Sequence, residues 1–139
     1  MTKIPLSLLA AALWWGSLTA IGFMAVPLLF AHLPTPAMAG NMAAQLFHAQ
    51  SWVSVGCAMV LLIYASKQPK VHDTQAQAAI ALIVFGVLCA LLGEYAIAPR
   101  IVARQNLRLW HSVGSVLYLL QWLCAGAVLW RAGRKTATP

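Results

Sequence analysis

The residues best suited to bind a metal or a haem are two histidines, His48 and His111, in an otherwise strongly apolar sequence. A neutral imidazole binds iron, copper or zinc through one of its ring nitrogens. Each histidine lies near the start of a predicted membrane span, about 42–65 for His48 and 109–130 for His111, and both stretches are uncharged. The two stretches would cross in the same direction, so we expect both imidazoles at a similar depth.

Two histidines at one depth on two helices of a bundle are typical of the axial ligands of haem b. Three arginines precede the last predicted helix and could pair with haem propionates. A glycine beside His111 would let a flat macrocycle approach the helix backbone. The cofactor-binding residues expected from this hypothesis are His48, His111, Arg100, Arg104, Arg108, Gly114 and Tyr118.

Three other interpretations fit the same residues. In the first, the two histidines hydrogen-bond across helices or to Glu94, and only hold the bundle together. In the second, the chain handles or exports copper or zinc, with His48, His111, Glu94 and His32 as ligands. Imidazole with carboxylate suits zinc, whereas imidazole with the thioethers of Met38 and Met42 suits copper. In the third, the chain is a non-catalytic accessory subunit of a membrane complex, and it binds no cofactor.

Glu94 is the one acidic residue inside a predicted span. We favour a structural pairing of its carboxylate with Arg100, Arg104 or His111 over a role as a proton relay. The sequence has two acidic residues in total, no Ser/His/Asp order and no Gly-rich phosphate loop. An enzyme is therefore the least supported class, and we predict no catalytic residue.

The elements that must position these groups are membrane-spanning helices. No Lys, Arg, Asp or Glu occurs from Ile4 to Ser66, and further uncharged runs cover 74–93 and 109–130. A bilayer core needs roughly 20 apolar residues per helix. The sequence therefore predicts an all-α, integral membrane four-helix bundle in one domain, 1–139, with helices at about 5–31, 42–65, 75–98 and 109–130.

Composition supports a chain embedded in the lipid bilayer. Hydrophobic residues make up 62% of the sequence and charged residues 8%, against about 25% charged in soluble domains. The net charge of +7 comes from basic residues that flank apolar runs, which fits lipid headgroups better than nucleic acid. Three cysteines near the middle of spans are expected to be buried apolar residues.

The basic residues also predict an orientation, because positive residues are enriched on the cytoplasmic side. With four spans, both termini and the 67–73 turn share one side. That side has more Lys and Arg, so we expect both termini in the cytoplasm. The two sets are Lys3, Lys67, Lys70, Arg131, Arg134 and Lys135 against Arg100, Arg104 and Arg108.

Three stretches of the sequence resemble one family. The run at 107–117, LRLWHSVGSVL, is similar to the Arg-x-x-His-Gly-x-Ser stretch that opens the last helix of the bacterial domain-of-unknown-function 4149 family, although Ser112 stands where that family often has Gly. The stretch from Leu13 to Phe30 and the Pro99-Arg100-Ile101 sequence also agree. The same pattern resembles eukaryotic transmembrane-protein-205-like proteins.

The resemblance implies a multi-pass protein of the bacterial inner membrane. The eukaryotic relatives are associated with tolerance to platinum drugs, which implies metal or thiol-reactive cargo.

Small residues in the first helix can bring backbones close together, either within the chain or between two copies in a homodimer. Those residues are Gly16, Ser17, Ala20 and Gly22.

Overall fold

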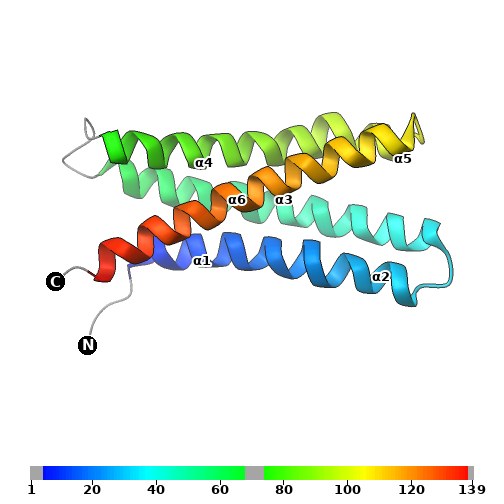
Figure 1. The fold of residues 1–139 in the computed structure, drawn as a ribbon, viewed down its shortest axis with the longest axis horizontal. Helices are drawn as coiled ribbons and strands as arrows, with labels where there is room; N and C mark the ends of the chain where they lie inside the picture. Colours follow the sequence, from blue (N-terminus) through cyan, green and yellow to red (C-terminus); the bar gives the residue numbers. More distant parts are fainter. Residues whose placement is uncertain (1–4, 68–73, 138–139) are drawn as a thin grey trace.

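A computed structural model describes residues 5–67 and 74–137, and they form four long helical segments (Figure 1). The first segment is α1 (Leu6–Thr19), η1 (Ala20–Ala25) and α2 (Val26–His32), and the second is α3 (Pro36–Ser66). The third is α4 (Thr74–Leu92), η2 (Gly93–Ile97) and α5 (Ala98–Val102), and the fourth is α6 (Leu107–Ala137). All four are long and apolar enough to cross a membrane, which confirms the predicted all-α, four-span fold.

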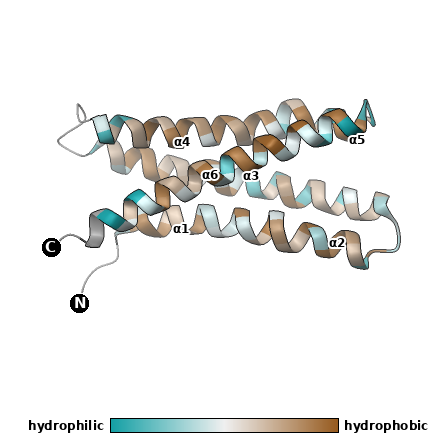
Figure 2. Ribbon diagram, in the orientation of Figure 1, coloured by the Kyte–Doolittle hydropathy of each residue, from teal (hydrophilic) through white to brown (hydrophobic). Residues whose placement is uncertain are grey.

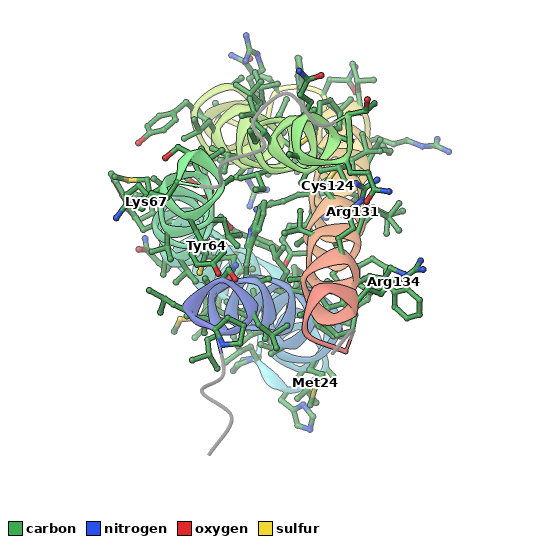
Figure 3. The ribbon with its side chains drawn as sticks, turned by 90° about the vertical axis from the view of Figure 1, so that its left-hand side faces the viewer. Met24, Tyr64, Lys67, Cys124, Arg131 and Arg134 are labelled. Carbon is green, nitrogen blue, oxygen red and sulfur yellow. The ribbon has the colours of Figure 1, made fainter. Side chains whose placement is uncertain are left out.

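The four segments pack side by side in a ring. The main contacts join α1 to α3, α3 to α4, α4 to α6 and α6 to α1, and the view along the bundle shows this order (Figure 3). Helices α3 and α6 are therefore diagonal to each other. The start of α1 and the end of α6 lie at one end, which we call the terminal end, and α5 lies at the other, the α5 end (Figure 1).

Helix α3 begins at Pro36, earlier than the predicted start near Met42. Thr35 caps the helix, because its side-chain oxygen accepts a hydrogen bond of 3.2 Å from the backbone N–H of Met38. Proline suits the first helical position, because the N–H that it lacks would have no partner within the helix and its fixed φ matches that of a helix. His48 consequently lies twelve residues into α3, about 18 Å along its axis.

The third segment continues through Pro99 to Val102, so the predicted stop at Pro99 is wrong. A π-helical turn, η2, precedes this proline, as η1 precedes Pro27 in the first segment. A proline inside a helix lacks an N–H and clashes with the carbonyl one turn earlier. A wider π-helical turn relieves that conflict, and each segment continues as α-helix beyond it.

A short turn joins α5 to α6 in place of the longer predicted linker. Arg104 and Asn106 have positive φ values of 54° and 35°, which let the chain reverse within a few residues. The opposite connection, predicted as a polar turn over 67–73, lies outside the described residues apart from Lys67, as do Lys3 and Lys70.

The core of the bundle is small and centred on α1. Trp14 and Leu18 are fully buried among residues of the other three segments. A Cβ at Gly86 would lie 2.9 Å from the Trp14 ring, so the glycine makes room for the indole against α4. The cysteines at 57, 89 and 124 are free and buried, as predicted.

Most residues along the four segments are hydrophobic or of intermediate hydropathy (Figure 2). Large hydrophobic side chains on every segment are exposed, which water would disfavour and acyl chains accommodate. Examples, from the first segment to the fourth, are Phe23, Leu28, Trp52, Met59, Phe85, Leu88, Val116 and Leu123. The surface therefore agrees with the helix lengths in indicating a membrane protein.

Four polar side chains form a central polar layer, Ser17, Gln50, Ser54 and Gln121. The Gln50 amide donates to the Ser17 hydroxyl oxygen at 3.0 Å and lies 3.4 Å from the Ser54 oxygen. The Gln121 amide donates to the same Ser54 oxygen at 2.7 Å. The layer thus joins α1, α3 and the diagonal helix α6 near the middle of the bundle.

Gly86→Ala should destabilise the bundle, because the new methyl group would meet the Trp14 ring in a filled core. Overpacking typically costs about 1 to 3 kcal/mol. The control is Gly56→Ala, since nothing lies within 4 Å of a Cβ built at Gly56. Unfolding by detergent titration in bicelles would measure both, and equal stability of the two variants would contradict this packing.

Ser54→Ala should also destabilise the fold, because it removes the acceptor that the Gln121 amide uses. We expect a loss of about 1 to 2 kcal/mol, as for other hydrogen bonds between membrane helices. Ser112→Ala is the matched control, since the exposed Ser112 hydroxyl bonds only the Arg108 carbonyl of its own helix. The same unfolding assay applies, and wild-type stability of Ser54→Ala would contradict the prediction.

Candidate functional site

Among the described residues, the shortest polar contact between two segments is the hydrogen bond of His48 with Glu94. Nδ1 of His48 on α3 lies 2.5 Å from Oε1 of Glu94 in η2. The side chain of His48 is 51% exposed, whereas that of Glu94 is 16% exposed. Imidazole and carboxylate therefore pair on the surface that the bundle turns toward lipid.

A tryptophan one turn along α3 assigns the tautomer of His48. The indole Nε1 of Trp52 lies 3.3 Å from Nε2 of His48. An indole N–H can only donate, so Nε2 must hold a lone pair and the proton of a neutral imidazole must be on Nδ1. Nδ1–H then donates to the Glu94 carboxylate, and Nε2 keeps a lone pair that only a long, weak contact occupies.

The π-helical turn η2 supplies Glu94 to this pair. Glu94 is the second residue of η2, directly after the last α-helical turn of α4. Turns of this kind are frequent at functional sites, since the wider turn changes the direction of side chains. The sequence feature that accompanies η2 is Pro99, which follows it by two residues. From the sequence, this proline is predicted to end the third helix.

A groove between α3 and α4 adjoins the pair. Its volume is about 170 Å³, and it is open to the surface of the bundle. Aliphatic and aromatic side chains form most of its wall, with the Glu94 carboxylate at one side. The lining residues are Ser51, Trp52, Val55, Val87, Leu91, Glu94 and Tyr95.

The second histidine, His111, lies apart from this pair. It is the fifth residue of α6, about 6 Å along the helix, whereas His48 is about 18 Å along α3. Its side chain is exposed, and among residues 5–67 and 74–137 no hydrogen bond or ring contact joins it to His48 or Glu94. His32, at the end of α2, has its Nδ1 3.0 Å from the Leu28 carbonyl.

The three predicted arginines lie at the α5 end and are exposed. The Arg100 guanidinium lies 4.7 Å above the Trp110 ring and donates to the Ala96 carbonyl. Arg104 occupies the positive-φ turn, and Arg108 is in the first turn of α6. Glu94 is bonded to His48, and not to Arg100, Arg104 or His111 as we predicted.

Gly114 and Tyr118 serve the packing of α6. A Cβ at Gly114 would lie 3.3 Å from the Ile97 side chain, so the glycine lets α6 approach η2. The Tyr118 hydroxyl donates to the Leu18 carbonyl at 2.7 Å, and its ring packs against Gly22. Trp122 adds a second bond between α6 and α1, from its indole to Thr19 at 2.9 Å.

Residues of the metal-binding hypothesis do not gather in one place. In the described part of the chain, no three His, Cys, Asp or Glu side chains come together as a group that could hold an ion. His48 and Glu94 form a pair, while His32 and His111 lie elsewhere. The pairing of His48 with Glu94 is the arrangement that the hydrogen-bonding alternative expected.

Comparison with protein-family models matches residues 9–109 to the family described as Domain of unknown function (DUF4149). The chain belongs to this family. The DUF4149 match confirms the resemblance seen in the sequence, and it contains His48, Trp52, Glu94 and the whole groove. It ends before His111. No curated protein and no solved structure matches the chain.

Nitrogen-15 NMR of selectively labelled protein should detect the Nδ1–H tautomer of His48 in the neutral state. The reason is that Trp52 and Glu94 present a donor and an acceptor to opposite ring nitrogens. His111, which has neither partner, should show the Nε2–H form or a mixture of tautomers. An Nε2–H tautomer at His48 would contradict the assigned hydrogen bonds.

Proposed function

We propose that this protein is a non-catalytic membrane protein that binds a lipid-soluble molecule with a polar single-ring head at the His48–Glu94 pair. The observation that carries the proposal is the half-exposed His48, which contacts two residues that line the groove, Glu94 through Nδ1 and Trp52 through Nε2. The ligand head would occupy the groove, and its tail would lie among the acyl chains.

The location of the pair supports a ligand that arrives through the membrane. Polar and ionisable groups in a span cost several kcal/mol when they face lipid, and they normally face the interior of the bundle. His48 departs from that rule, since half of its side chain is exposed. A polar head that covers Nε2 and part of the carboxylate would reduce this cost.

The volume of the groove indicates the size of the head. A cavity of about 150 Å³ holds one benzene ring in a well-studied protein of another family, and the groove here is about 170 Å³. One substituted six-membered ring therefore fits, whereas a four-pyrrole macrocycle exceeds the space. A second groove, of about 370 Å³, is lined by Trp15, Trp122, Trp130 and aliphatic residues, but no imidazole or carboxylate lines it.

Metal or haem binding through His48 is the second candidate, and one specific observation favours it. Histidines that bind metals usually donate their other ring N–H to a carboxylate, as His48 does to Glu94. Nε2 would then be the ligand atom for copper, zinc or the iron of haem b. Arg100, Arg104 and Arg108 are the residues that could pair with the propionates of a haem.

We also infer the orientation and the membrane. Lys67, Arg131 and Arg134 lie at the terminal end (Figure 3), and Lys3, Lys70 and Lys135 add to that side in the sequence. The α5 end has Arg100, Arg104 and Arg108. This excess supports cytoplasmic termini in a bacterial inner membrane, with the groove near the middle of the spans.

A brominated alkylphenol in lipid nanodiscs should quench tryptophan fluorescence in a saturable way, because Trp52 lines the groove. His48→Ala should weaken binding about tenfold by removing one hydrogen bond, while His111→Ala should bind like the wild type. Trp52→Phe should reduce the amplitude of quenching.

Absorption spectra and metal analysis of the same samples separate the two candidates. The ring-binding proposal would be overturned if His48→Ala and wild type bound the phenol equally. It would also be overturned if purified protein carried haem or metal that His48→Ala lost, with no saturable phenol binding. A haem signal that needed both His48 and His111 would instead support the two-histidine hypothesis.

A further inference from the structure

We infer that the groove discriminates between oxidation states of its ligand, and that it binds a hydroquinone or phenol head in preference to the corresponding quinone. This inference rests on the proposed function, since it concerns the same groove. Its basis is the fixed direction of the hydrogen bonds around His48.

The pair offers acceptors to a ligand and no donor of its own. Nδ1–H is directed at Glu94, so Nε2 can only accept. The Ser51 hydroxyl already donates to the Phe47 carbonyl at 3.0 Å and is left as an acceptor. A ligand hydroxyl can donate to these atoms, whereas a carbonyl oxygen cannot.

Trp52 strengthens the discrimination. A ligand hydroxyl that donates to Nε2 would displace the long indole contact, and the freed indole N–H could then donate to the hydroxyl oxygen. Both protein groups keep a partner in that arrangement. A ligand carbonyl could accept from Trp52, but it would leave the lone pair of Nε2 without a donor, which is unfavourable away from water.

Tyr95 works against this preference. Its side chain lines the groove and is 64% exposed, and its hydroxyl can either donate or accept. It could therefore donate to a quinone carbonyl. We expect the hydroquinone to bind about tenfold more tightly than the quinone in the wild type, corresponding to one hydrogen bond. This ratio of hydroquinone to quinone affinity should rise in Tyr95→Phe, because the variant lacks the hydroxyl that could donate to the quinone.

The experiment uses three probes with one ring and one alkyl tail, a hydroquinone, its quinone and its dimethyl ether. Each competes anaerobically with the brominated phenol for the full-length protein in nanodiscs. The expected order of affinity is hydroquinone first, with the quinone and the ether both about tenfold weaker. The ether separates loss of the donor from the change in ring electronics.

Two variants test whether the tautomer sets the preference. Glu94→Gln presents an amide that can donate to or accept from Nδ1, so only the long Trp52 contact still favours the Nδ1–H tautomer, and the ratio of hydroquinone to quinone affinity should fall. Ser51→Ala is the matched control, because it removes a groove hydroxyl and leaves the His48 tautomer unchanged. In Ser51→Ala, the ratio of hydroquinone to quinone affinity should stay at or above about threefold, within the range of a single weak hydrogen bond.

The outcomes separate this inference from the function it rests on. Equal binding of hydroquinone and quinone, or tighter binding of the quinone, would overturn the inference and leave the binding site in place. Saturable binding of none of the probes would overturn the proposed function as well. An unchanged ratio in Glu94→Gln would show that the tautomer is not its cause.

Discussion

The structure depends on one constraint, the absence of water from the hydrocarbon core of a bilayer, which makes a polar group inside the bundle costly unless it has a partner in the protein. The Ser54 hydroxyl oxygen accepts hydrogen bonds from two side-chain amides, Gln50 on α3 and Gln121 on α6. Tyr118 and Trp122 likewise donate hydrogen bonds to α1. Because these bonds join helices that lipid alone would not hold together, they also fix how the helices face one another.

The sequence predicted the spans well, because hydrophobic length depends on residues that are adjacent in the chain. It predicted helix ends less well. Thr35 caps α3 through a local side-chain bond, and Pro99 continues within a helix because a wider turn precedes it. Both outcomes depend on geometry over a few residues, and a proline in an apolar run is compatible with either a stop or a bulge.

The candidate site was predicted in part. Spacing along a helix places residues on one face, but it does not give the rotation of one helix relative to another, so the sequence could not select His48 over arginine as the partner of Glu94. The contact of Trp52 with His48 was not predicted. The four-residue separation of the two side chains could have indicated it.

The two π-helical turns affect how residues of this family should be assigned to helix faces from a sequence alignment. Each turn contains about one residue more than an α-helical turn, so the chain beyond it is rotated by about 100° relative to an uninterrupted helix. A helical wheel drawn straight through Pro27 or Pro99 would consequently assign the residues after the bulge to the wrong side. A homologue that lost one residue at such a position would turn Glu94 or its neighbours away from α3 without any substitution at those residues.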